Sequence, residues 1–254
     1  MRVVTVGTGT VVPDPARAGA CLWVEHGSLR VVLDCGPGAL QAMARHGLPW
    51  ASVTHLALTH FHTDHLNDVP ALLFALKYAV PNPRTAPLHV VGPVGTRELL
   101  ARWARALGDW LAAPGFPLPV TELGPDEVCP LGDDATLAAH PTPHTDESVA
   151  YRLATPTGSL GYTGDTGASD ALADFLAGVD LLVAECSLPD DRAVDHHLTP
   201  RRVAALARRA RPRTLVCTHV YPPLRDTDVA AAVRAAGYDG PVVHAADGMT
   251  FDLA

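Results

Sequence analysis

Three histidines and one aspartate lie within six residues of each other early in the chain. The stretch LALTHFHTDHLNDVP contains His60, His62, Asp64 and His65. Imidazole nitrogens bind zinc, iron and manganese, and an added carboxylate lets a second cation sit nearby. Because six residues cannot wrap all four groups round a single ion without strain, we expect two pairs, each contributing to its own ion.

The other ligands are expected from three later points, each at the end of a predicted strand. His144 ends the segment HPTPH, Asp165 follows a strand in YTGDT, and His219 ends the strand LVCTH. A lone histidine is more often a surface or core residue than a ligand. Next to the dense first cluster, however, this shared placement predicts that all of these residues meet at one rim of a pair of sheets.

The elements that must position these residues alternate between strands and helices. Such alternation favours a mixed α/β domain, and nothing marks a domain boundary, so we expect a single domain over residues 1–254. Residues 113–134, rich in proline, glycine and aspartate, read as irregular. Strands are predicted over 2–7, 20–27, 29–36, 55–60, 88–93, 148–155, 159–165, 180–186 and 214–219, and helices over 66–80, 95–112 and 199–210.

Composition narrows the class of protein. With 48% hydrophobic and 18% charged residues, the chain reads as globular rather than disordered. Its formal net charge of -8 argues against a protein that grips long nucleic acids. The start lacks the apolar core of a signal peptide, and no apolar run is long enough to span a membrane. The five cysteines are scattered without a C-x-x-C pair, so we expect reduced thiols in a cytoplasmic protein.

The ordered set of motifs resembles the metallo-β-lactamase fold hydrolases, and within them the ribonuclease Z-like branch. The likeness spans nearly the whole chain except about residues 80–135. It implies an α/β fold, the four-layer αββα sandwich, with the site at one edge between two sheets. Besides H-x-H-x-D-H, the matching segments are VGTGTVVPDPARAGACLWVE, LDCGPGALQAM, YTGDTGASDALADFLAGVDLLVAECS and DHHLTPRRVAALA.

The resemblance also implies a set of ligands and two divalent metal ions. Zinc is the first expectation, and manganese or iron are alternatives. Asp165 would bridge the two ions. The first ion would be held by His60, His62 and His144, and the second by Asp64, His65 and His219.

Two further residues match the catalytic positions of the family, and Asp64, itself an expected ligand, is the third catalytic candidate. His197, which directly precedes Leu-Thr, matches the proton donor better than His196 does, and Glu185 matches the acid that orients it. A hydroxide shared by two cations would attack the ester, and an imidazole can protonate the departing alkoxide near neutral pH. The alternative interpretations are a surface histidine at a helix start and a solvated or supporting glutamate.

The expected substrate is a small phosphodiester, for example a cyclic nucleotide. Relatives that process tRNA usually carry a projecting arm between the positions that match His144 and Asp165, and here a short predicted hairpin uses that interval. Thr63 also replaces a glycine common in those enzymes. The alternatives are a lactonase, thioesterase or β-lactamase-type acyl hydrolase, a tRNA 3′-processing endonuclease, and a binding module without catalysis.

No partner beyond a small-molecule ester is expected, except a second copy of the chain. Neither a long nucleic acid nor a membrane fits the composition. A stripe of Leu99, Trp103, Leu107 and Trp110 at helical spacing reads as core or as a subunit contact. Because members of the branch are frequently dimers, the resemblance implies a homodimer contact.

Overall fold

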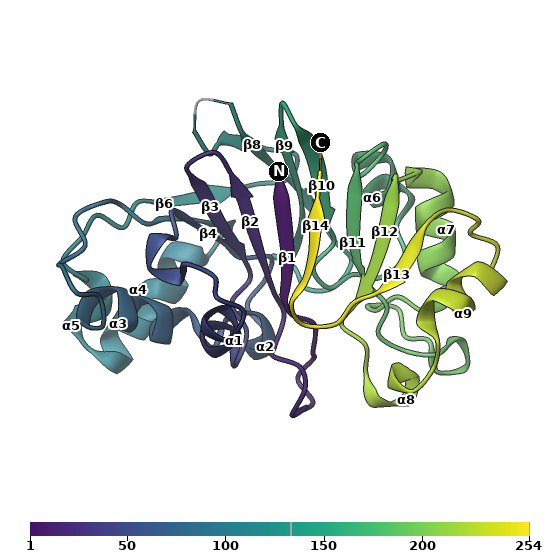
Figure 1. The fold of residues 1–254 in the computed structure, drawn as a ribbon, viewed down its shortest axis with the longest axis horizontal. Helices are drawn as coiled ribbons and strands as arrows, with labels where there is room; N and C mark the ends of the chain where they lie inside the picture. Colours follow the sequence, from purple (N-terminus) through teal and green to yellow (C-terminus); the bar gives the residue numbers. More distant parts are fainter. Residues whose placement is uncertain (133, 254) are drawn as a thin grey trace.

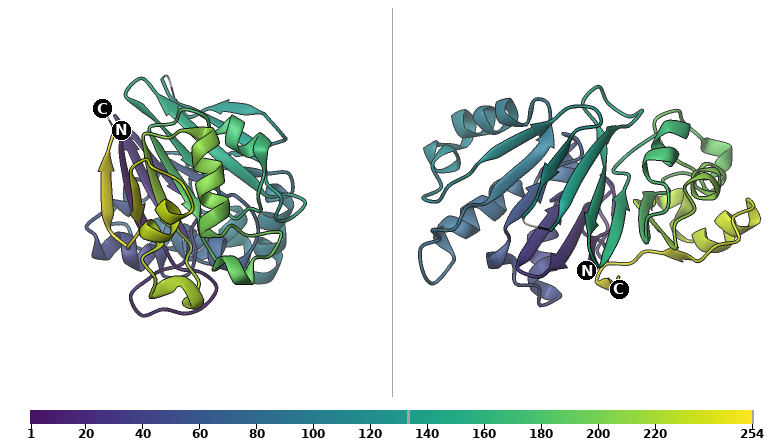
Figure 2. Two further views of the ribbon diagram at one scale, coloured as in Figure 1. Left: turned by 90° about the vertical axis from the view of Figure 1, so that its right-hand side faces the viewer. Right: turned by 90° about the horizontal axis from the view of Figure 1, so that it is seen from above.

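Two mixed sheets packed face to face form the centre of the computed structural model, which describes residues 1–132 and 134–253 (Figures 1 and 2). The first sheet consists, in spatial order, of β14 (Met249–Asp252), β1 (Arg2–Gly7), β2 (Cys21–His26), β3 (Leu29–Leu33), β4 (His55–Ala57), β5 (His89–Pro93) and β6 (Val120–Leu123). The second consists of β13 (Val242–His244), β12 (Thr214–Thr218), β11 (Leu181–Glu185), β10 (Gly158–Tyr162), β9 (Val149–Thr155), β8 (Thr136–Pro141) and β7 (Val128–Pro130).

Helices cover the outer face of each sheet, so the predicted αββα sandwich is confirmed (Figure 2). The first sheet carries α1 (Ala39–Arg45), α2 (Thr63–Leu66), α3 (Val69–Tyr78), α4 (Thr96–Leu107) and α5 (Asp109–Ala112). The second carries α6 (Asp170–Phe175), α7 (Pro200–Ala210), α8 (Pro222–Arg225) and α9 (Val229–Ala235). Short 3-10 turns cover Trp50–Ser52 and Asp190–Arg192.

Strand residues alternate between two hydrophobic cores because successive side chains of a strand point to opposite faces. On β2, Leu22 and Val24 belong to the core between the sheets, whereas Trp23 packs under the helices. On the facing sheet, Tyr151 and Leu153 of β9 reach the same central core. This alternation holds the two sheets together and leaves their edges free to carry polar loops.

The predicted elements are recovered with several shifted boundaries. The antiparallel meander of β1, β2 and β3 is confirmed, as is the β9–β10 hairpin. The predicted strand 55–60 ends at Ala57, and the predicted helix 66–80 begins only at Val69, after the separate turn of α2. The predicted helix 95–112 is divided at Gly108, whose φ of 113° lies outside helical geometry.

The prediction of an irregular segment over residues 113–134 was wrong in part. This segment contains β6, which pairs in parallel with β5, and β7, which pairs with β8. The carbonyls of Pro117 and Pro119 accept hydrogen bonds from Leu88 and Val90, so the prolines join the sheet through their acceptors. Pairing with distant strands overrides the turn-rich composition.

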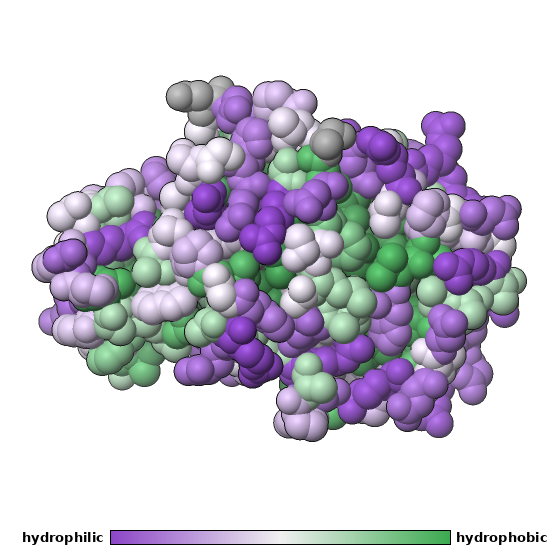
Figure 3. Space-filling view, viewed as in Figure 1, coloured by the Kyte–Doolittle hydropathy of each residue, from purple (hydrophilic) through white to green (hydrophobic). Residues whose placement is uncertain are grey.

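Helices α3 and α4, on the outer face of the first sheet, expose several large apolar side chains. Figure 3 shows apolar surface gathered there, and Phe74, Tyr78 and Leu107 are about half exposed. Trp103 and Trp110 pack partly buried against the core, in agreement with the core interpretation of their stripe.

The homodimer and the single domain stay predictions. Among the described residues, no helix combines the length and hydrophobicity needed to span a bilayer.

Candidate metal centre

The histidine-rich loop begins after β4 and is tied to both sheets. The amide and hydroxyl of Thr59 donate to the two carboxylate oxygens of Asp34, each at 2.8 Å, and the Thr59 carbonyl accepts from Val149 on β9 at 2.9 Å. Gly164 lies against this loop with a φ of 55°, and a Cβ there would meet the Thr59 side chain at 2.8 Å. Only glycine therefore lets the loop before Asp165 approach so closely.

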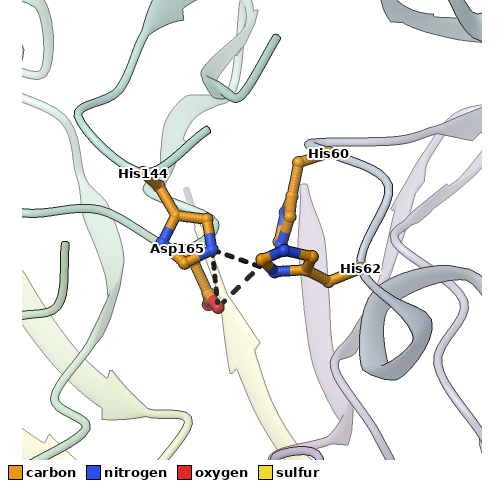
Figure 4. A group of neighbouring side chains, drawn as sticks. All are labelled: His60, His62, His144 and Asp165. Carbon is orange, nitrogen blue, oxygen red and sulfur yellow. Dashed lines mark hydrogen bonds and ion pairs between the residues drawn. The ribbon is translucent and has the colours of Figure 1, made fainter. Parts of the chain in front are cut away.

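All seven candidate ligands predicted from the sequence converge at this edge, in two groups, and Figure 4 shows the first of them, His60, His62, His144 and Asp165. In each group the candidate ligand atoms lie within 4.8 Å of one another. One group comprises His60, His62, His144 and Asp165, and the other Asp64, His65 and His219.

The Asp165 carboxylate turns one oxygen towards each group. Its Oδ2 lies 3.9 Å from Nε2 of His60 and 3.7 Å from Nε2 of His144. Its Oδ1 lies 3.2 Å from Nε2 of His65 and 3.5 Å from Nε2 of His219. This is the placement that a carboxylate shared by two cations requires.

Hydrogen bonds at Nδ1 orient four of the histidines. Nδ1 of His65 lies 2.7 Å from Asp34 Oδ2, and Nδ1 of His144 lies 2.9 Å from the His196 carbonyl. Both partners are acceptors, so each Nδ1 carries the proton and Nε2 keeps its lone pair.

The same assignment holds where the partner of Nδ1 is a hydroxyl. Thr59 Oγ1, 3.0 Å from Nδ1 of His60, already donates to Asp34. Ser187 Oγ, 3.1 Å from Nδ1 of His219, already donates to Glu185. Because the single proton of each hydroxyl is already donated elsewhere, the hydroxyl oxygen accepts a hydrogen bond from Nδ1–H of the imidazole. His62 differs, because its Nδ1 faces Nε2 of His144 at 3.0 Å.

Some buried polar atoms of the centre have no hydrogen-bond partner in the described part of the chain. Such free lone pairs are expected where side chains are arranged to bind a cation. Nε2 of His60 and Oδ1 of Asp165 are buried and accept no hydrogen bond within the described residues. An unpaired buried polar atom costs about 1–3 kcal/mol. Lone pairs of His65 and His219 also face each other, with 3.4 Å between their Nε2 atoms. The donor set of imidazoles and carboxylates therefore fits divalent cations.

Electrostatics favour a neutral imidazole at His60 and an ionised carboxylate at Asp165, the forms that bind a metal ion. Burial, reinforced by the neighbouring His65, lowers the pKa of His60 far below its usual range. Burial opposes ionisation of Asp165, yet His219 and His65 hold the pKa of its carboxyl well below the ordinary value. For His65 burial is outweighed by Asp165 and Asp34, which raise its pKa well above normal. The carboxylates of Asp165 and Asp34 thus favour a positive charge at this point of the centre.

His197 and Glu185 lie beside the second group. Nδ1 of His197 is 2.9 Å from Glu185 Oε1, and the His197 ring lies within ligand distance of Asp165 and His219. Glu185 is itself held by the amide of Thr166 at 2.7 Å. Burial opposes protonation of His197, but the Glu185 hydrogen bond and charge raise the pKa of the imidazole. His196 is exposed, and its backbone carbonyl rather than its ring supports the centre.

Sequence reasoning missed the residues that hold the ligands in place. Asp34 is fully buried and accepts from His65, Thr59 and the Tyr162 hydroxyl at 2.9 Å. Its φ of 56°, like that of His219, is left-handed, a strain that tertiary contacts must maintain. The motif L-D-C-G was the available signal for Asp34. No local pattern identifies Ser187.

The site opens to solvent through a cavity of about 370 Å³. Its lining residues are Val11, Phe61, His62, Thr63, Asp64, His144, Asp165, His196, His197 and Tyr221. Tyr221 stands edge-on to His197 and His219, with ring centroids 5.9 and 5.6 Å away. Burial and the carboxylates of the centre raise the pKa of Tyr221 to about 12, so its hydroxyl stays protonated.

Comparisons with known proteins agree with this geometry. The model of the beta-lactamase superfamily domain matches residues 29–220, most of the chain. Ribonuclease Z of Mycobacterium bovis is 31% identical over 250 residues, which cover 87% of this chain and 86% of that protein. The chain belongs to the metallo-β-lactamase fold family, in its ribonuclease Z-like branch. It is a metal-dependent hydrolase.

Solved structures of the metallo-β-lactamase fold superpose over nearly the whole chain. The metallo-beta-lactamase fold protein YhfI of Bacillus subtilis matches with a TM-score of 0.85 and 20% identity, covering 98% of each chain. The short form of human tRNase Z matches with a TM-score of 0.81 and 23% identity, covering 100% of each chain. At these identities the structures establish the fold.

Proposed function

We propose that this hydrolase cleaves a small phosphodiester with the help of two divalent metal ions. The observation that carries the proposal is the placement of His197, whose Nδ1 lies 2.9 Å from Glu185 while its ring borders the ligand groups. His197 is thereby placed to give a proton to a departing alkoxide, the step that cleavage of an alkyl phosphodiester requires.

The seven ligands would divide as the geometry groups them. Bound ions would polarise a phosphoryl oxygen and lower the pKa of water towards neutrality, and zinc, manganese and iron all suit the donors. Asp165 would lie between the ions. His60, His62 and His144 would hold one ion, and Asp64, His65 and His219 the other.

The remaining steps belong to the side chains of this chain. Glu185 accepts from Nδ1–H of His197 and stabilises the imidazolium, as its effect on the pKa indicates. His197 then gives its Nε2 proton to the leaving oxygen and returns to the neutral form. Asp64, held 3.3 Å from Nε2 of His219, keeps the second ligand group negatively charged beside the reacting ester.

A compact substrate is supported by the segment between His144 and Asp165. Strands β9 and β10 occupy it as an antiparallel hairpin within the second sheet, which leaves no insertion for a projecting arm. The principal alternative, tRNA 3′-processing, is favoured by the 31% identity with a ribonuclease Z. An acyl hydrolase remains the second alternative, since its chemistry uses the same kind of metal pair.

A panel of substrates tests the proposal. After loading with zinc or manganese, the enzyme should hydrolyse bis(p-nitrophenyl) phosphate and at least one of the 2′,3′- or 3′,5′-cyclic nucleotides, and Asp165→Ala should abolish both activities. Turnover of lactones or thioesters alone would reject the proposal. Cleavage of precursor tRNA without turnover of small diesters would establish the endonuclease instead.

The leaving group tests the role of His197. His197→Ala should lower kcat for a cyclic nucleotide by about 100-fold or more, because its alkoxide needs a proton. The effect on bis(p-nitrophenyl) phosphate should be much smaller, since p-nitrophenolate leaves unprotonated. Equal losses on both substrates would assign His197 to the support of the metal ions.

A further inference from the structure

A second cavity adjoins the cavity of the metal centre, and His197 does not line it. Its volume is about 480 Å³, within the usual range for a small-molecule site. It shares Val11, Thr63 and Asp64 with the cavity of the metal centre, so a bound molecule can extend from one into the other. Its other walls are the loop between β1 and β2 and one face of α1.

The cavity presents one uncommitted positive charge. Arg45, exposed in the last turn of α1, makes no side-chain hydrogen bond or ion pair with residues 1–132 or 134–253. Arg17 is committed, because it donates to the hydroxyl of Thr8 and, at 2.8 Å, to the Ala245 carbonyl. Of the two carboxylates in the lining, Asp14 is paired with Arg225 at 3.0 Å, and Asp64 belongs to the candidate metal ligands. In a chain of net charge -8, this local balance favours an anion.

Amide side chains complete the lining near Arg45. Gln41 stands four residues before Arg45 on α1, so both project from the same helical face. Asn67, exposed after α2, borders the cavity next to the metal-binding loop. A guanidinium with nearby amides can bind a phosphate bidentately and satisfy its remaining oxygens.

Building on the proposed function, we propose that the substrate is a phosphodiester whose retained arm carries a second phosphate, bound by Arg45 in this cavity. The arm stays on the phosphorus after cleavage, because His197, the donor to the leaving oxygen, lines only the other cavity. Nucleotide-type diesters that bear a further terminal phosphate belong to this class.

The kinetic test compares two chromogenic diesters that differ by one phosphate. They are thymidine 5′-(p-nitrophenyl phosphate) and its 3′-phosphorylated form, both releasing p-nitrophenolate. The metal-loaded wild type should prefer the 3′-phosphorylated form by about tenfold in kcat/KM, as expected for a charge-assisted contact at a partly exposed site. Arg45→Ala should lose this preference, and Arg45→Lys should keep part of it.

Arg105→Ala is the matched control, since this exposed arginine of α4 lines neither cavity. It should leave the preference of the wild type intact. Equal preference in wild type and Arg45→Ala, or no preference in the wild type, would overturn the inference while leaving the phosphodiesterase proposal standing.

Calorimetry with products gives a readout that needs no turnover. Thymidine 3′,5′-bisphosphate should bind the metal-loaded protein about tenfold more tightly than thymidine 5′-monophosphate, and Arg45→Ala should remove the difference. If neither diester is hydrolysed, the proposed function fails, and this titration still decides whether Arg45 binds a second phosphate. Identical affinities in wild type would reject that site.

Discussion

The two ends of strand β4 both carry histidines, but only one end forms a candidate metal site. At the carboxyl end, the loop after Ala57 leads into the ligand groups. At the amino end, His55 stacks on His89 with ring centroids 4.8 Å apart, beside a cavity also lined by His26 and Asp134. Within residues 1–132 and 134–253, none of these belongs to a group that could hold a metal.

The partners of the ring nitrogens explain the difference. At the metal centre, fixed acceptors take Nδ1–H and the free Nε2 atoms surround a shared carboxylate. At the other end, Nδ1 of His55 also has a partner, Thr54 Oγ1 at 2.9 Å, but the nearby Asp134 is taken by His26 at 3.0 Å. A metal site therefore needs an uncommitted carboxylate between oriented imidazoles, and a high local content of histidine is insufficient.

Removing the shared carboxylate should separate the two ends most strongly. Asp165→Asn should lower metal content and reduce diester hydrolysis by more than about 100-fold, because both ligand groups lose their common anion. His89→Asn should change neither quantity, as metal analysis and steady-state kinetics would reveal. Full metal occupancy in Asp165→Asn would contradict the bridging role.

Metal removal should destabilise the centre and leave the other end unaffected. A chelator should lower the Tm of the metal-loaded protein by about 5–10 °C, since ligand at 100 times its Kd contributes about 2.7 kcal/mol. His55→Asn should show the same difference in calorimetry. Asp165→Asn should show little, and an equal shift in that variant would place the stabilising metal elsewhere.

The partner of Nδ1 should matter at the metal end alone. Asp34→Asn leaves His65 without its carboxylate acceptor and should weaken metal binding by about 10–100-fold, measured by competition with a chromogenic chelator. Asparagine tolerates the left-handed backbone of this position. Thr54→Ser, which keeps the acceptor of His55, should leave the affinity unchanged. Unaltered affinity in Asp34→Asn would show that His65 is oriented by packing.

The smallest effect should come from the pH response of the amino end. Burial, and to a lesser degree His89, lower the pKa of His55 from 6.5 to about 4. The neutral ring is favoured in the fold, so its stabilising contribution is complete above pH 6.5 and disappears as the pH falls towards 4. Wild type should lose about 1 kcal/mol more than His55→Asn on going from pH 7.5 to 5.5 in urea unfolding. Parallel curves would reject a buried neutral His55.

Local patterns made the convergence of the candidate ligands predictable. Four candidate ligands lie so close in sequence that any fold keeps them together, namely His60, His62, Asp64 and His65. Their imidazole and carboxylate groups are typical metal ligands. His144, Asp165 and His219 were placed with them from strand ends and from the family resemblance. They follow β8, β10 and β12 within three residues, so small errors in strand boundaries did not move them to another edge.

Long-range pairing was beyond the same reasoning. Strands β6 and β7 lie in a segment that reads as loops, and β13 and β14 follow the last predicted element. Each is only three or four residues long and is stabilised by a neighbouring strand. Their own residues contain too little periodicity to identify them.

The sequence by itself determined that imidazoles and carboxylates of this chain form a metal-binding cluster, because residue type and short spacing suffice for that. Tertiary structure alone decided that Asp165 turns one oxygen to each group and that Asp34 and Ser187 orient His65 and His219. The physical reason is that a hydrogen bond at Nδ1 sets which lone pair faces the centre. Its partners come from other strands and loops, which only the packing of two sheets brings within reach.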